Sequence, residues 1–471
     1  MSETLFDFGM IGLGTMGRNL LLNMADNGFA VIGFDKDESK GASLVTEASN
    51  AKHVKAVTSL ETMVKQLKTP RKIMMLVPAG KPVDDVIESL LPLLDKKDIV
   101  IDGGNSFFAD TLRRVTYLES KGLHFMGMGV SGGEKGARFG PSIMPGGDVK
   151  AWSEVKPLLE AIAAKVNGEA CVAYMGKDAA GHYVKMVHNG IEYAIMQLIS
   201  EVYDLLKRGL GLSNKELHEV FDTWNKGELQ SFLVEITKDI FLQKDEVTGK
   251  DLVDVILDKA GSKGTGKWTS QEAMNLPVSI PTIDIAVALR DLSSYKDERV
   301  AAGKVYQPKI NAITTDKKQF IQQVGDALYA ATLLCYAQGL SMLHKASAEM
   351  KMDIPMDDVV KIWRGGCIIR SVLLEDFYKA YKAEAGLPNI LLNASIAGIL
   401  QSKEESLRAV IAQAVQSKIA ATGLMSALGY FDAYSTERMP VNLIQAQRDF
   451  FGAHTYQRID KEGSFHTQWN S

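Results

Sequence analysis

Short apolar runs alternate with amphipathic segments along the first third of the chain. Glycine, proline or polar residues bound the apolar runs, as expected for buried strands, and the segments between them have helical periodicity. Alternation of strand and helix is typical of a mostly parallel, doubly wound sheet. We therefore predict an α/β, Rossmann-like dinucleotide-binding domain over 1–178, with strands at 6–12, 30–34, 72–78, 98–104, 124–133 and 171–176 and helices at 15–27, 83–94, 110–121 and 151–165.

Beyond a glycine-containing link at 175–181, helical periodicity becomes almost continuous. Long helices are predicted at 180–208 and 324–350, and the whole of 179–434 is predicted to form a large all-α domain. Two stretches, 219–227 and 358–366, resemble each other and each follows a long helix, which favours a duplicated helical unit. The matched positions are Val220 with Val359, Trp224 with Trp363, and Gly227 with Gly366.

The last segment, 435–471, forms an extended C-terminal tail in this prediction. It includes a Met-Pro break and loses helical periodicity after about residue 450. Because it is rich in aromatic residues, we expect it to pack on another surface, such as a second subunit.

Composition narrows the range of partners and compartments. The chain has 471 residues, 46% of them hydrophobic and 23% charged, and a net charge of -4, which argues against nucleic acid or a membrane as a partner. Its three cysteines are scattered, as free thiols in a reducing compartment would be. No signal peptide or long apolar run is present, so we expect a cytoplasmic protein.

A glycine-rich turn provides the cofactor signal. Gly12-Leu13-Gly14-Thr15-Met16-Gly17 follows a predicted strand directly and opens a predicted helix. Such glycines permit a tight turn and close approach to a pyrophosphate, which the helix N-terminus then binds. The segment therefore predicts a dinucleotide site.

The next predicted strand ends near an acidic residue. Asp35 lies 23 residues after Gly12, where a carboxylate accepts hydrogen bonds from the adenosine ribose. A carboxylate there favours NAD because it repels a 2′-phosphate, although the adjacent Lys36 partly offsets that repulsion for NADP. Later strand ends place Val77, Pro78, Ala79 and Asn105 at the same edge of the sheet, with Asn105 on the nicotinamide and substrate side.

One helical segment, 185–193, combines a polar stripe with apolar flanks. Lys185, His188, Asn189 and Glu192 have the spacing i, i+3, i+4 and i+7, so they share one helix face. A solvated face with an ion pair is the plain interpretation. The functional one is a cleft with two proton-transfer groups about 10 Å apart. A lysine base requires burial to lower its pKa towards neutrality.

Three other stretches have compositions suited to an anion. Residues 261–268 offer Lys263 among flexible glycines, 445–454 offer Arg448 and His454, and 130–136 offer a hydroxyl and free backbone amides. Each signal is weak by itself.

Together the motifs resemble the decarboxylating 6-phosphogluconate dehydrogenase family of the β-hydroxyacid dehydrogenase superfamily, over essentially the whole chain. GSKGTGKW and KMVHNGIEY are highly specific to that family, whereas IGLGTMG is shared across the superfamily. The full set is IGLGTMG, IDGGNS, VSGGEKGA, PSIMPGGD, GHYVKMVHNGIEY, ILDKAGSKGTGKW, YKDER and QAQRDFFGAHTY.

The resemblance implies oxidation of 6-phosphogluconate at C3, loss of CO2 and release of ribulose 5-phosphate. It implies that Lys185 takes the C3 hydroxyl proton and later returns it, and that Glu192 protonates C1. No metal is implied. Implied substrate contacts are Ser131, Gly132, Gly133, His188 and Asn189 for the carboxylate and hydroxyls, and Tyr193, Lys263, Arg290 and Arg448 near the phosphate.

The resemblance also implies an obligate homodimer. Arg448 and His454 on the tail would reach into the partner subunit's active site, and 179–434 would bind substrate and form the dimer interface.

The chain departs from the family at the adenosine end of the site. NADP-dependent members usually have Asn-Arg-Thr/Ser where this chain has Asp35-Lys36-Asp37. We therefore expect NAD to be used at least as well as NADP.

Three alternative functions fit the sequence less well. Short-chain β-hydroxyacid dehydrogenases resemble only the first 300 residues. A ketol-acid reductoisomerase would need magnesium carboxylates on its helices. A dinucleotide-sensing scaffold would leave the Lys185/Glu192 face without a purpose.

Overall fold

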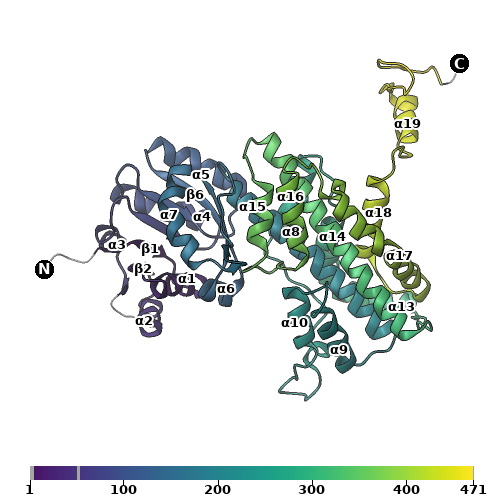
Figure 1. The fold of residues 1–471 in the computed structure, drawn as a ribbon, viewed down its shortest axis with the longest axis horizontal. Coiled ribbons are helices and arrows are strands. Elements are labelled where there is room, and N and C mark those ends of the chain that lie inside the picture. Colours follow the sequence, from purple (N-terminus) through teal and green to yellow (C-terminus); the bar gives the residue numbers. More distant parts are fainter. Residues whose placement is uncertain (1–4, 50–52, 470–471) are drawn as a thin grey trace.

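A seven-stranded sheet forms the first part of the computed structural model, which describes residues 5–49 and 53–469 (Figure 1). The ends of the predicted segments, 1–4 and 470–471, and residues 50–52 lie outside the described residues. The strand order is β3-β2-β1-β4-β5-β6-β7, and all neighbours are parallel except β7, which is antiparallel to β6. The strands are β1 (Phe8–Ile11), β2 (Val31–Phe34), β3 (Val54–Val57), β4 (Lys72–Met75), β5 (Ile99–Asp102), β6 (His124–Ser131) and β7 (Ser142–Gly147).

Helices cover both faces of this sheet, which confirms the predicted doubly wound fold. One face packs against α1, α2 and α7, and the other against α3, α4 and α5. Their bounds, with the short α6, are α1 (Thr15–Asp26), α2 (Glu38–Glu47), α3 (Leu60–Lys65), α4 (Lys81–Leu90), α5 (Phe108–Ser120), α6 (Gly133–Phe139) and α7 (Val149–Ile162).

The predicted strand at 171–176 is wrong. Val172 makes only an isolated bridge to Ile143, with the Ile143 N–H donating to the Cys171 carbonyl at 3.0 Å. The edge position beside β6 belongs instead to β7, which contains Pro145 and two glycines and therefore lacks a strand-like composition. The prediction also missed β3, a half-exposed edge strand.

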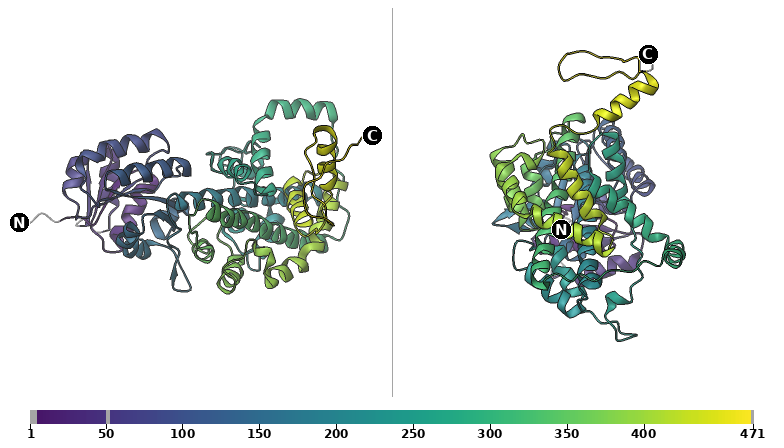
Figure 2. Two further views of the ribbon diagram at one scale, coloured as in Figure 1. Left: turned by 90° about the horizontal axis from the view of Figure 1, so that it is seen from above. Right: turned by 90° about the vertical axis from the view of Figure 1, so that its right-hand side faces the viewer.

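The rest of the chain is almost wholly helical, as predicted (Figure 2). The long helix α8 runs from the sheet into this region and continues as a short π-helix at Leu205–Gly209. The helices are α8 (Ala180–Asp204), α9 (Asn214–Trp224), α10 (Phe232–Ile240), α11 (Thr265–Asn275), α12 (Pro281–Ser294), α13 (Lys296–Tyr306), α14 (Lys317–Glu349), α15 (Met356–Trp363), α16 (Leu373–Ala383), α17 (Ala394–Ser417), α18 (Thr422–Tyr434) and α19 (Asn442–Gly452).

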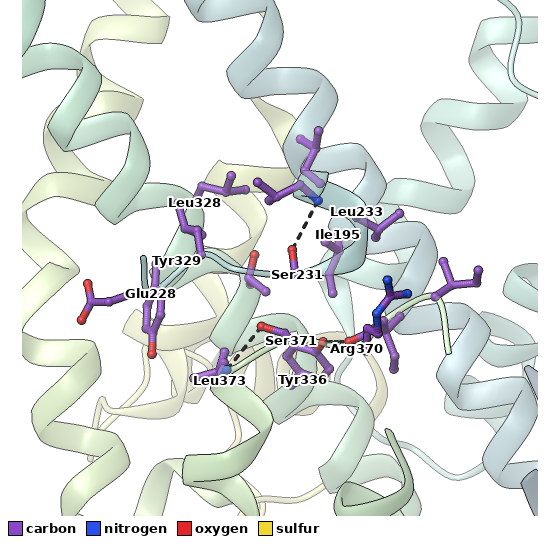
Figure 3. Close-up of a pocket in the computed structure, with 16 residues that line it drawn as sticks. Ile195, Glu228, Ser231, Leu233, Leu328, Tyr329, Tyr336, Arg370, Ser371 and Leu373 are labelled. Atoms are coloured by element: carbon purple, nitrogen blue, oxygen red, sulfur yellow. Dashed lines mark hydrogen bonds between the residues drawn. The ribbon is translucent and has the colours of Figure 1, made fainter. Parts of the chain in front are cut away.

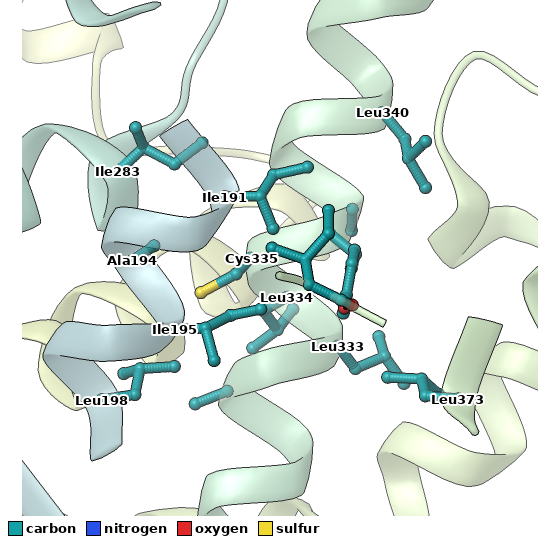
Figure 4. Close-up of a cluster of buried hydrophobic side chains, with 14 of the residues drawn as sticks. Ile191, Ala194, Ile195, Leu198, Ile283, Leu333, Leu334, Cys335, Leu340 and Leu373 are labelled. Atoms are coloured by element: carbon teal, nitrogen blue, oxygen red, sulfur yellow. The ribbon is translucent and has the colours of Figure 1, made fainter. Parts of the chain in front are cut away.

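The apolar side of α8 packs against α14 in the main hydrophobic core. Figure 4 shows Ile191, Ala194 and Ile195 of α8 beside Leu334 and Cys335 of α14. All five are buried, so the helical core fixes this side of α8.

The order of a long helix followed by a short one occurs twice. α9 ends at Trp224 after α8, and α15 ends at Trp363 after α14. The order supports a duplicated unit, which stays a prediction.

The tail extends away from the helical body beyond α18 (Figure 1). A hydrogen-bond network around the fully buried Asp449 holds the tail together. The Asp449 carboxylate accepts hydrogen bonds from the Thr455 and Thr467 amides and the Trp469 indole. Phe451, by contrast, is 73% exposed. The tail therefore has local structure but leaves apolar surface uncovered within one chain. Among the residues that the structure describes, no helix is long and apolar enough to cross a membrane.

Candidate active site

A cavity of about 470 Å³ lies at the carboxyl ends of the first parallel strands. Its lining includes six of the thirteen predicted cofactor residues, namely Gly12, Gly14, Asp35, Lys36, Val77 and Pro78. This is the edge at which doubly wound sheets bind dinucleotides.

The glycine turn fits a pyrophosphate. A Cβ on Gly14, the N-cap of α1, would meet no atom within 4 Å, so open space lies over the helix N-terminus. A Cβ on Gly17 would lie 1.9 Å from the Gly12 carbonyl oxygen, which explains why the turn needs glycine there. Open space beside backbone N–H groups is the arrangement that binds phosphate groups.

Asp35 is held firmly at the end of β2. Its carboxylate accepts the Leu13 N–H at 2.9 Å and the Asp37 N–H at 3.0 Å, and Lys40 lies at 3.3 Å. Burial opposes ionisation, but these contacts lower the pKa of Asp35 overall, so the residue is charged at neutral pH. The Asp37 carboxylate accepts from Ser39 and caps α2 instead, and Asp37 does not line the cavity with Gly12.

Close backbone contact places α8 against the sheet. A Cβ on Gly129 of β6 would lie 2.4 Å from the Lys185 Cβ, and one on Gly146 of β7 would lie 2.2 Å from the Gly181 nitrogen. We call these four residues the glycine seam. Only glycine at positions 129, 146 and 181 permits this close approach. The approach places Lys185 beside β6, where it is 6% exposed.

The four residues of the predicted polar stripe lie on α8, and contacts join three of them, His188, Asn189 and Glu192. His188, which is fully buried, lies 3.4 Å from Ser131 through Nε2, 3.0 Å from the Asn189 amide oxygen through Nδ1, and 3.9 Å from the Glu192 carboxylate. The Asn189 amide in turn donates to Thr265 Oγ1 at 3.0 Å. The stripe is thus tied to the end of β6 and to the start of α11.

Burial shifts the proton affinities of this face in opposite directions. It lowers the pKa of Lys185, against the influence of Glu192 and the Cys367 thiol. It also holds the pKa of His188 well below its usual range, with Lys185 adding to the effect. Burial raises the pKa of Glu192, with Lys185 and Arg290 opposing the rise. The site therefore favours a neutral lysine and a protonated glutamic acid, a base and an acid two helical turns apart.

Tyr193 and Arg290 form the next part of the face. The Arg290 guanidinium lies 3.6 Å from the centre of the Tyr193 ring and donates to the Gly261 carbonyl at 3.3 Å. Lys263 follows in the same loop and is exposed. Three of the predicted phosphate residues are therefore arranged around the 261–264 loop.

The structure does not bring the tail residues to this face within one chain. Arg448 and His454 lie on and just after α19, which stands apart from the body (Figure 1). Arg448 contacts Gln445 at 3.1 Å, and His454 lies against Phe451.

A second cavity continues along α8 beyond Glu192. It is small, about 20 Å³, and is lined by Ile195, Ile199, Leu328 and Tyr329, with Arg370 at one side (Figure 3). Its lining is mainly apolar, in contrast to the polar stripe.

Several residues of the site escaped the prediction. Lys40 contacts Asp35 from five positions along the chain, because α2 starts between the two residues. Without the start of α2, the sequence spacing does not indicate this contact. Gly129 and Thr265 matter through contacts distant in sequence. In the described part of the chain, no group of three His, Cys, Asp or Glu residues is arranged to hold a metal ion.

Comparison with known proteins covers both halves of the chain. Residues 7–176 match the family described as "NAD binding domain of 6-phosphogluconate dehydrogenase", and residues 181–469 match "6-phosphogluconate dehydrogenase, C-terminal domain". The NADP(+)-dependent, decarboxylating 6-phosphogluconate dehydrogenase of Bacillus subtilis (strain 168) is 53% identical over 462 residues, with 98% of each chain covered.

Other relatives extend the likeness. The decarboxylating 6-phosphogluconate dehydrogenase of Lactococcus lactis subsp. lactis is 50% identical over 466 residues, again with 98% of each chain covered. A Plasmodium falciparum 6-phosphogluconate dehydrogenase, solved in its apo form and with NADP+ or 6-phosphogluconate, superposes with a TM-score of 0.96 at 40% identity. That match covers 98% of this chain and 100% of the other.

Proposed function

Because this chain belongs to the 6-phosphogluconate dehydrogenase family, we propose that it oxidises and decarboxylates 6-phosphogluconate to ribulose 5-phosphate and CO2 with reduction of NADP+ or NAD+. Within this proposal, 1–178 binds the dinucleotide, 179–434 binds substrate and forms the dimer, and 435–471 is the exchanged tail. The three free, buried cysteines suit a cytoplasmic location.

The observation that carries the proposal is that Lys185, 6% exposed, and Glu192, with its side chain 22% exposed, lie two turns apart on one face of α8. Burial lowers the pKa of Lys185 and raises that of Glu192. A lysine that loses its proton easily is suited to take the proton of the C3 hydroxyl. Bound nicotinamide supplies the acceptor for the C3 hydride. Lys185, now protonated, donates a hydrogen bond to the C3 carbonyl oxygen and stabilises the negative charge that develops there as the bond to the carboxylate breaks.

Glu192 completes the reaction. Loss of CO2 leaves an enediol, and Glu192, whose pKa is raised by burial, delivers its proton to C1 of the product. As CO2 leaves, Lys185 returns its proton to the C3 oxygen, which becomes a hydroxyl of the enediol. When Glu192 protonates C1 of the product, neutral Lys185 takes the proton of that hydroxyl and the ketone forms. His188, Asn189 and Ser131 are suited to bind the carboxylate and hydroxyls, because they are connected at the start of this face.

We also propose that this chain uses NAD at least as well as NADP. The support is the charged, firmly held Asp35 carboxylate at the end of β2, which can accept from the ribose hydroxyls and repels a 2′-phosphate. Lys36 and Lys40 lie in the same cavity and reduce that repulsion without removing it.

A direct assay tests the function. Purified protein is incubated with 6-phosphogluconate and each dinucleotide, and nicotinamide absorbance is followed together with released CO2. We expect equal amounts of reduced nicotinamide and CO2. Reduction without CO2, or no reduction with either dinucleotide, would contradict the proposal.

We further propose that the active site is completed by the tail of a second subunit. The support is that Arg448 lies away from α8 in its own chain while the tail exposes apolar side chains, including Phe451. Exposed apolar side chains on α13, such as Val305 at 75%, extend the surface that a partner would cover.

Mixed dimers separate exchange from a tail that acts on its own subunit. Lys185→Ala and Arg448→Ala proteins, each inactive, are dissociated, mixed in equal amounts and allowed to reassociate. With exchange, each heterodimer has one site with both groups, and about a quarter of wild-type activity returns. With a tail that serves its own subunit, no site regains both groups and no activity returns, which would refute exchange.

A further inference from the structure

A fully buried arginine joins the two loops that follow β4 and β5. Arg114 lies in α5 and is 0% exposed. Its Nε donates to Asp84 at 2.8 Å, one Nη to the Gly80 carbonyl at 3.0 Å, and the other to Asp102 at 3.4 Å. A guanidinium has several donors in a fixed planar arrangement, so it can hold these three groups at a set spacing.

The partners of Arg114 belong to the cofactor-binding segments. Gly80 directly follows Val77-Pro78-Ala79 and is the N-cap of α4, with a φ of 87°. Asp102 ends β5, and its carboxylate accepts the Gly104 N–H at 3.0 Å and the Ser106 hydroxyl at 2.6 Å. These two bonds shape the turn that contains Asn105. Arg114 therefore connects the loop after β4 to the loop on the nicotinamide side.

The same helix reaches the base-bearing helix. Thr111, one turn before Arg114 on α5, lies 2.7 Å from Nδ1 of His182, and both side chains are buried. His182 is one turn before Lys185 on α8. A buried chain of contacts thus runs from Gly80 through α5 to the turn that precedes the base.

We propose that Arg114 is a positioning residue for hydride transfer. By fixing the spacing of the loops at 77–80 and 102–105, it sets where the nicotinamide stands relative to the substrate C3 and Lys185. The expected effect on hydride transfer rests on the proposed function, whereas the expected effect on dinucleotide binding does not. A displacement of about 1 Å at a reacting centre costs about 100-fold in rate, so such a residue affects chemistry and not only stability.

The neighbouring Arg113 provides a matched control. It also bonds Asp84, at 2.9 Å, but its side chain is 55% exposed and its hydrogen bonds go to Asp84 without extending to Gly80 or Asp102. Arg113→Met therefore removes the same charge from the same helix, while leaving the spacing of the loops intact.

The experiment compares Arg114→Met, Arg114→Lys and Arg113→Met in the full-length protein. Binding of NADH and NADPH is titrated by fluorescence without substrate. The kcat, the KM for each dinucleotide and the isotope effect from 6-phosphogluconate deuterated at C3 are then measured, with thermal unfolding as a check on folding. Ser106→Ala, which removes a single bond to Asp102, serves as a milder variant if Arg114→Met does not fold.

We expect Arg114→Met to bind dinucleotide about 10-fold more weakly and to lose about 100-fold in kcat, with a larger isotope effect because hydride transfer becomes slower. Arg114→Lys should recover part of the loss, and Ser106→Ala should shift the isotope effect in the same direction. Arg113→Met should stay within about twofold of wild type.

Two results would overturn the proposal. One is a folded Arg114→Met or Ser106→Ala protein with unchanged dinucleotide binding and isotope effect, which would make the contacts structural only. The other is an equal loss in Arg113→Met. Failure of the proposed function is distinguishable, since it would appear as inactive wild-type protein, while the dinucleotide titrations would still test Arg114.

Discussion

Replacement of Asp35 by asparagine should move the cofactor preference towards NADP. The substitution keeps the shape of the side chain and one oxygen, which can accept the Leu13 N–H that now lies 2.9 Å from Oδ2, but it loses the hydrogen bond from the Asp37 N–H. It removes the negative charge that the structure holds at the end of β2. The contact with Leu13 should therefore stay in place while the electrostatics of the adenosine end change.

The magnitude follows from the charges involved. A carboxylate about 5 Å from a 2′-phosphate dianion is repelled by about 2 kcal/mol even at a water-like dielectric constant. Hydrogen bonds to the ribose hydroxyls weaken by about 1 kcal/mol when the acceptor becomes neutral. In the variant, the interaction with NADP becomes about 2 kcal/mol more favourable and that with NAD about 1 kcal/mol less favourable. The difference of about 3 kcal/mol corresponds to a change of about 100-fold in the ratio of kcat/KM for the two dinucleotides.

The assay measures initial rates with both dinucleotides at saturating 6-phosphogluconate, for wild type and for Asp35→Asn and Asp37→Asn. Asp37→Asn is the matched control, because it removes the same charge two residues away and asparagine can still cap α2. We expect the control to change the ratio by less than about threefold, since its charge lies outside the cavity and is screened. An unchanged ratio in folded Asp35→Asn, or equal changes in the two variants, would refute the assignment of Asp35 as the specificity residue.

Three further predictions concern α8. The proposed mechanism requires a neutral Lys185, and burial lowers the pKa of this residue, so kcat/KM should rise with pH through a value below the ordinary 10.5. Lys185→Ala should lose activity by about 1000-fold or more while it still binds dinucleotide. Normal turnover in this variant would exclude Lys185 as the base. The proposed mechanism requires a protonated Glu192, whose pKa is raised above 4.5, so activity should fall once the pH exceeds that raised value. Glu192→Gln should be about 100-fold less active, and its activity should no longer fall at high pH. If the fall persists in Glu192→Gln, another group causes it. Gly129→Ala should destabilise the protein by about 1–3 kcal/mol in urea unfolding and reduce kcat, because the new Cβ would lie 2.4 Å from the Cβ of Lys185. Gly398→Ala is the control and should do neither, because its Cβ would meet no atom within 4 Å. Equal behaviour of the two variants would contradict the close packing at Gly129.

Local patterns were sufficient for part of the fold. The turn at Gly12–Gly17 is specified by residues that are adjacent in sequence, and the strands β1, β2, β4, β5 and β6 carry continuous apolar runs. β7 was missed because Pro145 and its glycines favour turns, and they form a strand only where β6 supplies a partner. The edge strand β3 is half exposed, so its sequence lacks a burial pattern.

The site shows the same division. The shared face of Lys185 and Glu192 follows from helical spacing alone, whereas its burial depends on Gly129, 56 residues upstream of Lys185. Arg114 resembles an ordinary surface cation in sequence, next to the exposed Arg113. Only the fold shows that one of these two arginines is buried between carboxylates.

The glycine seam has a consequence for altering this protein. The main chain of α8 is located by direct contact with the main chains of β6 and β7, so the origin of the Lys185 side chain does not depend on how neighbouring side chains rotate. Positions on α11 and in the tail that would face substrate in the proposed function can accordingly be changed without moving the attachment point of the base. Redesign of substrate range should therefore succeed at those elements, while the seam itself tolerates no added atom.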